Sequence, residues 1–85
     1  MKLYDILTAY EGVNDIVLID VTNEFETLNK NNIFRLIINL NHDYRKSESF
    51  NKINLSLERY GFEIVDIKFN VHDFGTTLNY LIKEL

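Results

Sequence analysis

The chain contains no cysteine, no proline and no tryptophan, and only three glycines among its 85 residues. Without cysteine it forms no disulfide and no thiolate metal site, so we expect a protein of the reducing cytoplasm. The three glycines are too far apart to build a glycine-rich phosphate-binding loop. No apolar run approaches eighteen residues, and the first residues lack the pattern of a signal peptide, so no membrane contact is predicted.

The residues that are present have the composition of a folded domain. Apolar residues make up 46% and charged residues 26% of the chain, which predicts one domain spanning 1–85. Asparagine occurs eleven times and isoleucine ten times, whereas alanine occurs once. Because asparagine and isoleucine have AT-rich codons and alanine has GC-rich ones, this bias indicates a low-GC genome as the source.

The net charge of −4 comes entirely from the first thirty residues. That segment holds only Lys2 and Lys30 against six carboxylates, at Asp5, Glu11, Asp15, Asp20, Glu24 and Glu26. A net negative charge disfavours direct binding to nucleic acid, whose phosphate backbone is itself negative. It favours a protein partner with a basic surface.

Apolar periodicity predicts three helices and three strands in the order α-β-β-α-β-α. Helical spacing places amphipathic helices over 3–10, 50–60 and 78–85. An apolar run over 16–19, the hairpin that follows it, and alternation over 62–71 predict the strands. The expected fold class is α+β: a single small domain in which a three-stranded sheet with a β-hairpin is packed by amphipathic helices.

The polar turn 29–32 sets the expected register of the hairpin. With these four residues as the loop, Phe25 lies opposite Leu36, and Glu26 lies opposite Arg35 as an oppositely charged pair. The face turned to the core then carries Val17, Ile19, Val21 and Phe25 with Phe34, Leu36, Ile38 and Leu40. The other face carries the acidic Asp20 and Glu24.

Apolar side chains also remain on that outer face, at Ile16, Leu18, Leu28, Ile33 and Ile37. Two helices of about 10 Å diameter already cover one face of a sheet about 15 Å wide. Either the first helix or a partner therefore covers these outer residues.

Two similar tetrapeptides, at 41–44 (Asn-His-Asp-Tyr) and 71–74 (Val-His-Asp-Phe), each close a predicted strand. A His–Asp pair is a candidate for metal binding or proton transfer. The strands before them have inward residues at even positions in one and odd positions in the other, so the tetrapeptides are not a structural repeat. We interpret both as polar strand ends, and we expect no enzyme activity, no metal and no cofactor.

Five basic residues give the segment 31–60 a small positive excess: Arg35, Arg45, Lys46, Lys52 and Arg59. A patch formed by Arg35, Arg45 and Lys52 would make the protein a weak nucleic-acid-binding regulator, which is one alternative function. An ordinary solvated helix face explains the same charges, because three acids offset them, at Asp43, Glu48 and Glu58.

The first quarter of the chain resembles the small accessory proteins of low-GC phages and mobile elements. Many of these open with a short amphipathic helix, here Lys2 to Tyr10, a glycine break, here Gly12, and a hydrophobic strand, here Asp15 to Val21. The resemblance implies a class of role: such proteins often bind and disable a host protein, and anti-CRISPR proteins, which disable defence nucleases, are one kind. It implies no functional residues, because it has no diagnostic motif.

We therefore predict a small acidic protein-interaction module that inhibits or modulates a host nucleic-acid-binding protein, for example as an anti-CRISPR type inhibitor. Its partner would be a host or phage protein, such as a nuclease, in the host cytoplasm. The expected contact is Asp20 and Glu24, with the apolar Leu18 and Ile37 beside them. The alternative is a structural or assembly protein that forms a homodimer through Ile16, Leu18, Ile33 and Ile37.

Overall fold

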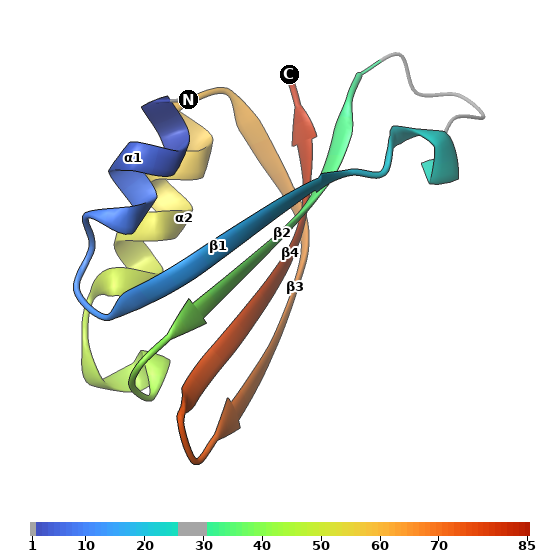
Figure 1. Cartoon of the computed structure of the whole chain (residues 1–85). Helices are drawn as coiled ribbons and strands as arrows, with labels where there is room; N and C mark the ends of the chain where they lie inside the picture. Colours follow the sequence, from blue (N-terminus) through green and yellow to red (C-terminus); the bar gives the residue numbers. More distant parts are fainter. Residues whose placement is uncertain (1, 26–30) are drawn as a thin grey trace.

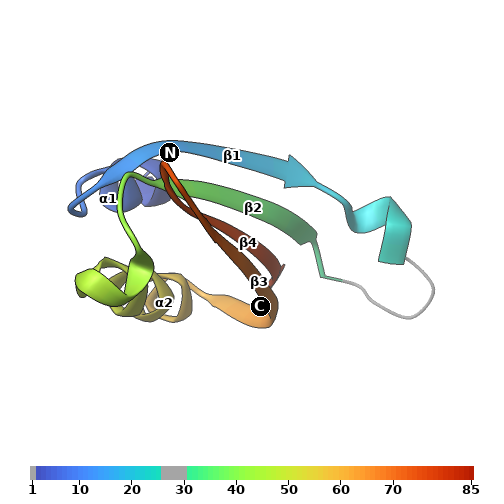
Figure 2. The ribbon, with the colours of Figure 1, turned by 90° about the horizontal axis from the view of Figure 1, so that it is seen from below.

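The structure is a computed structural model and describes residues 2–25 and 31–85. Two helices lie together on one face of a four-stranded antiparallel sheet (Figure 1 and Figure 2). The elements are α1 (Lys2–Thr8), β1 (Val13–Asp20), the 3₁₀ helix η1 (Thr22–Phe25), β2 (Ile33–Leu40), the 3₁₀ helix η2 (Tyr44–Lys46), α2 (Ser49–Arg59), β3 (Phe62–His72) and β4 (Gly75–Glu84). No helix in the described ranges is long and apolar enough to cross a membrane.

The chain passes twice through the same order of elements, a helix followed by two antiparallel strands. The strand order is β1-β2-β4-β3, so β2 and β4 form the centre of the sheet. β1 and β3 are therefore the two edges, and they occupy equivalent positions in the two units.

The core lies between the central strands and the two helices. Alternate residues of β2 and β4 point into it and are almost completely buried: Leu36, Ile38, Leu40, Leu78, Tyr80 and Ile82. α1 contributes Leu3 and Leu7, and α2 contributes Ile53 and Leu57, in both cases at the four-residue spacing of one helix face. Burying each of these apolar side chains contributes about 1.5–3 kcal/mol, so the short helices are held mainly by this packing.

Tyr80 is the largest fully buried side chain, and its polar end is satisfied within the core. The phenol hydroxyl donates a hydrogen bond to Oδ1 of Asn54 on α2. Burial raises the pKa of Tyr80 above its ordinary value because the phenolate would lose its hydration. This hydrogen bond adds a directional contact between α2 and β4 to the apolar packing.

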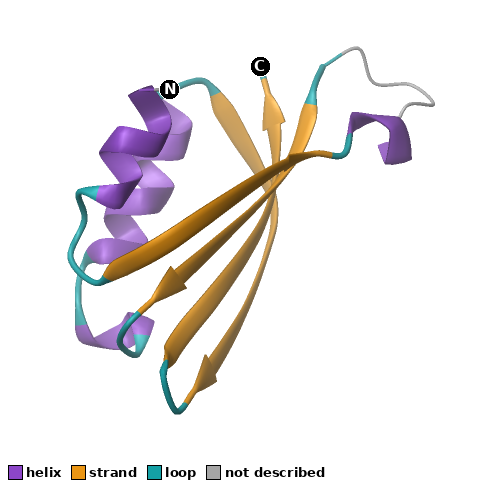
Figure 3. Ribbon diagram, in the orientation of Figure 1, coloured by secondary structure: helices purple, strands orange, loops and turns teal. Residues whose placement is uncertain are grey.

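The sequence-based helices over 3–10 and 50–60 are confirmed as α1 and α2, and the strand over 62–71 is confirmed as β3. The helix predicted over 78–85 is wrong, because this segment belongs to β4 (Figure 3). The sheet therefore has four strands and packs against two helices, instead of three strands and three helices.

The error over 78–85 arises because its apolar residues fit two periods. Leu78, Leu81, Ile82 and Leu85 have helical spacing, whereas Thr76, Leu78, Tyr80 and Ile82 alternate as in a strand. The strand forms because β4 pairs with β2 along one edge and with β3 along the other. Both sets of main-chain hydrogen bonds favour the extended conformation.

The predicted register of the hairpin is also wrong. Leu36 lies opposite Leu18 instead of Phe25, which is a shift of seven residues along the first strand. Because side chains alternate between the two faces, an odd shift moves every residue of β1 to the opposite face. Ile16 and Leu18 therefore face the helices, and Val17 and Ile19, expected in the core, lie on the outer face.

The shift has a local cause at the end of β1. The chain leaves the sheet and forms η1 directly afterwards, so the connection between the strands is much longer than the four-residue turn expected over 29–32. Asp20 stabilises η1 by accepting a hydrogen bond from the Thr22 main-chain N–H at 2.9 Å. Leu28 and the expected pairing of Glu26 with Arg35 lie outside the described residues.

The turn between β3 and β4 requires glycine at Gly75. Its φ of +138° lies in a region that other residues rarely adopt, and an added Cβ would overlap the carbonyl oxygen of Leu40 on β2. We predict that Gly75→Ala lowers the free energy of unfolding by about 2–4 kcal/mol. Urea denaturation of both forms measures the loss.

Gly61 is the matched control for that substitution. It also has a positive φ, of +89°, but its position for a Cβ is open. Gly61→Ala should cost only about 1 kcal/mol from the backbone conformation alone. Equal losses for the two variants would contradict the close approach of Gly75 to β2.

Candidate protein-interaction surface

The face of the sheet opposite the two helices is here called the outer face (Figure 2). It carries the side chains that the register turns away from the core. Four apolar residues from three neighbouring strands remain at least partly exposed on it: Val17, Ile19, Ile37 and Leu81. Val17 lies directly opposite Ile37, and Ile19 and Leu81 lie on either side of Arg35 in the next row. We call these four residues the outer apolar patch.

Polar side chains beside this patch are hydrogen-bonded to one another across the sheet. Asn39 donates to Asp15 at 2.7 Å and accepts from the Thr77 hydroxyl at 2.9 Å, and Thr77 in turn contacts His72 Nε2 at 3.1 Å. This chain of contacts runs from β1 to β3. Arg35 donates to Asn79 at 3.1 Å in a second cross-strand pair.

The charges of the outer face balance one another. Its acids are Asp15, Glu63 and Asp66, and its bases are Arg35, Lys68 and Lys83. Lys83 lies 3.8 Å from Glu63, across the β3–β4 pair. The middle of the sheet is therefore a mixed surface with no acidic character of its own.

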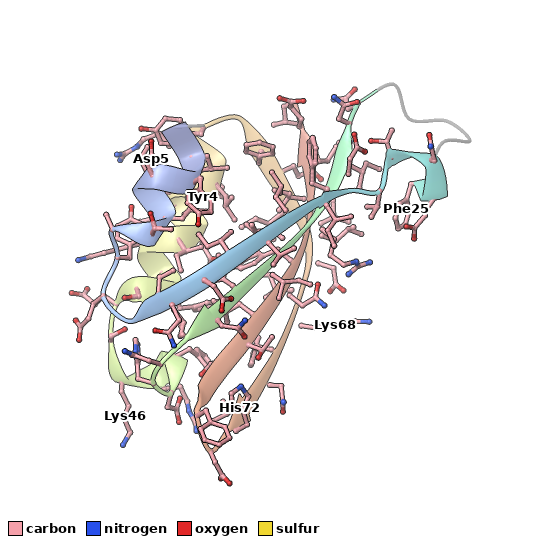
Figure 4. The ribbon with its side chains drawn as sticks, in the orientation of Figure 1. Tyr4, Asp5, Phe25, Lys46, Lys68 and His72 are labelled. Carbon is pink, nitrogen blue, oxygen red and sulfur yellow. The ribbon has the colours of Figure 1, made fainter. Side chains whose placement is uncertain are left out.

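The acidic residues lie instead along one side of the molecule, formed by α1, β1 and η1. Residues 3–25 contain no lysine, arginine or histidine and five carboxylates, at Asp5, Glu11, Asp15, Asp20 and Glu24. All five are exposed. Figure 4 shows Asp5 on the outside of α1, and Figure 1 shows β1 running along the edge of the sheet below it.

Apolar side chains are exposed along the same edge. Val17, Leu18 and Ile19 follow one another in β1 and are 47%, 37% and 44% exposed. Leu18 points to the helix side, and its two neighbours point to the outer face. The β1 edge therefore combines exposed apolar groups on both faces of the strand with acidic groups at both ends, and we call residues 15–24 the β1 site.

The structure separates the four residues expected to form the contact. Leu18 and Ile37 lie on opposite faces of the sheet, which corrects the expectation that both lie on the outer one. Asp20 lies at the end of β1 on the helix side, opposite Phe34, and not on the outer face as expected, and Glu24 lies in η1. Asp20 has a structural task, because its hydrogen bonds from the Thr22 hydroxyl and N–H hold η1 and lower the pKa of its carboxyl.

Sequence reasoning missed three residues of this surface: Val17 and Ile19, which are exposed, and Leu81, which is partly buried. The apolar run 16–19 predicts a strand with apolar groups on both faces, but it does not say which members face the helices. The helix predicted over 78–85 includes Leu81, which hides its place on a sheet face. Ile16, also expected on the outer face, packs instead against the helix-side core. Ile33 lies on the outer face by register, opposite Lys83, but it is buried.

The His–Asp tetrapeptides lie at strand ends, as interpreted, and neither forms a dyad. His42 contacts Asn41 at 3.0 Å and Ser47 at 2.7 Å. Arg45 binds Asp43 through its main-chain N–H and its guanidinium, and these hydrogen bonds hold the pKa of the Asp43 carboxyl far below its usual range. Among the residues described here, no group of three potential metal ligands and no pocket is present.

The basic residues considered for nucleic-acid binding lie apart. Arg35 is on the outer face and is partly buried, whereas Lys52 is on α2, which covers the opposite face. The Arg45 guanidinium is hydrogen-bonded to the Asp43 carboxylate. The three do not form one continuous patch.

Comparisons with models of known protein families, with curated proteins and with solved structures give no match.

We predict that Thr22→Ala raises the pKa of the Asp20 carboxyl toward its ordinary value of about 3.9, because the substitution removes the hydroxyl that hydrogen-bonds the ionised form. A carbon-detected NMR titration of the side-chain carboxyl measures this directly. Since the pKa of Asp20 is lowered by folding, the associated stability is present above about pH 4 and is lost as the pH falls below it.

Thr8→Ala is the control, because the Thr8 hydroxyl bonds main-chain carbonyls of α1 instead. It should leave the Asp20 titration unchanged. If the pKa of Asp20 were the same in Thr22→Ala as in the wild type, the hydrogen bond from the Thr22 hydroxyl to Asp20 would not form in solution.

Proposed function

We propose that this chain is a protein-interaction module that binds a partner through its β1 site and thereby inhibits or modulates that partner. The observation that carries the proposal is the coincidence of exposed Val17, Leu18 and Ile19 with a run of carboxylates that no basic residue offsets over 3–25. Exposed apolar groups bordered by charge of one sign favour a partner that offers apolar groups bordered by the opposite sign.

The partner that fits best is a basic protein, and nucleic-acid-binding proteins are the main class of such surfaces. Complementary charge raises the rate of encounter and rejects acidic competitors, while the desolvated apolar groups supply most of the affinity. A host or phage nuclease in the cytoplasm is such a partner, and an inhibitor of the anti-CRISPR type would have this role. The proposal for this narrower class is supported by the charge of the β1 site and by the resemblance of residues 2–21 to phage accessory proteins.

A second candidate function is that of an assembly protein in which two copies pack their outer faces together. It is supported by the outer apolar patch, which no helix covers in the described part of the chain. The balanced charges around the patch do not oppose contact between two identical faces. This function predicts that the mass measured by sedimentation rises from that of a monomer to that of a dimer as the protein concentration is raised.

The test of the main proposal is charge reversal on one side of the molecule. Glu11→Lys with Glu24→Lys places one base in the β1 site and one in the segment just before it, and both positions are exposed. We predict that an immobilised double variant captures basic nucleic-acid-binding proteins from a lysate of the source cell at least about tenfold less than the wild type. Quantitative mass spectrometry of the captured proteins gives the ratio.

Glu48→Lys with Glu58→Lys is the matched control, because it changes the net charge equally at exposed positions around α2. This variant should retain capture. Equal loss in both variants would mean that only overall charge matters, and unchanged capture in both would contradict a contact at the β1 site.

A further inference from the structure

β1 has main-chain hydrogen-bonding groups that point away from the sheet. The Val21 N–H donates to the Ile33 carbonyl at 2.8 Å, so Val21 is turned toward β2. In an antiparallel pair the residues that bond the neighbouring strand alternate, which also turns Val17 and Ile19 toward β2. The N–H and C=O groups of Ile16 and Leu18 therefore point to the free side of β1, where the described part of the sheet has no further strand.

The equivalent edge, β3, has features that block the addition of a strand. Its register is interrupted in its interior, between Ile64 and Asp66, and Lys68 follows two residues later. Interruptions and lysines are the devices by which natural sheets protect their edges. β1 differs in both respects: its own irregularity lies at its start, between Val13 and Asp15, and it contains no basic residue or proline.

An added strand would cover apolar side chains on both faces of β1. Leu18 on the helix side and Val17 and Ile19 on the outer face are all more than one third exposed. A strand lying about 4.8 Å beyond β1 would place its own side chains against them on both faces. The free main-chain groups and the exposed side chains thus favour the same type of ligand.

The carboxylates at the ends of the β1 site favour one kind of added strand over another. If two copies of β1 paired antiparallel with Leu18 opposite Leu18, Asp20 of one copy would lie opposite Ile16 of the other, one residue from its Asp15. Each end of such a pair would then bring two carboxylates together with no base between them, and like charges this close destabilise a strand pair. A strand with lysine or arginine at its ends would instead meet the carboxylates at both ends of the β1 site.

We propose that β1 binds an extended segment of the partner as a fifth strand of the sheet. That segment has an alternating apolar centre and basic residues at both ends, and it is hydrogen-bonded to the main chain of Ile16 and Leu18. The inference rests on the proposed function, which places the partner at the β1 site, and it adds the mode of recognition.

The probe for the test is a pair of synthetic peptides with the same core of alternating valine and threonine, one with two lysines and one with two glutamates at each end. The complete chain should bind the lysine-flanked peptide at least tenfold more tightly. Leu18→Pro should weaken that binding at least tenfold, because it removes an outward N–H and leaves the bonds to β2 in place. Leu18→Val, which keeps the N–H and an apolar side chain, should lose much less affinity than Leu18→Pro.

Amide hydrogen exchange of the wild-type chain provides a second readout that does not depend on the folding of a variant. Addition of the lysine-flanked peptide should slow exchange at Ile16 and Leu18. Unchanged exchange at these two amides, or equal binding by Leu18→Pro and Leu18→Val, would overturn the fifth strand while leaving the proposed function in place. Equal affinity for the two peptides would instead count against the basic partner of the proposed function.

Discussion

The register between β1 and β2 is the constraint on which the rest of this structure depends. Leu18 lies opposite Leu36 and Ile16 opposite Ile38, so the helix-side residues of β1 continue the buried rows of the central strands. A shift by one residue would exchange the two faces of β1 and would bring Val17 and Ile19 to the core. The same register turns the main chain of Ile16 and Leu18 toward solvent, and it therefore fixes both the side chains and the hydrogen-bonding groups of the β1 site.

The central strands supply the stability that lets an exposed edge persist. β2 and β4 each pair on both sides, and their inward residues form the core with α1 and α2. Each edge strand is bonded on one side only, yet the two edges differ in sequence. Both edges expose apolar side chains, Val65, Phe69 and Val71 on β3 and Val17 to Ile19 on β1. β3 also has an interruption in its interior and a lysine, whereas the interruption of β1 lies at its start and its only charged residues are carboxylates. That difference between two equivalent positions is what distinguishes β1 as a binding element.

Much of the fold follows from the sequence, because α1, α2 and β3 each have a single dominant period. β4 could not be assigned in this way: Leu78 and Ile82 belong both to a helical stripe and to a strand alternation, and only pairing with two neighbours decides between them. The register of β1 was missed because η1 follows the strand directly, which a polar turn further along the chain does not reveal.

Of the properties of the candidate site, only its negative charge could be predicted from the sequence. The absence of basic residues over 3–25 is visible without a structure, and it marks the β1 side of the molecule. The sequence does not show that Leu18 and Ile37 lie on opposite faces, or that the Asp20 carboxylate accepts a hydrogen bond from the first residue of η1.

The most direct test of this account is a measurement of the β1–β2 register in solution by NMR. Residues in a non-hydrogen-bonded antiparallel pair have closely spaced main chains, so their α-protons give strong cross-strand contacts. The account predicts such contacts between Leu18 and Leu36 and between Ile16 and Ile38. A contact between Phe25 and Leu36 instead would return Val17 and Ile19 to the core and would contradict both the β1 site and the proposed fifth strand.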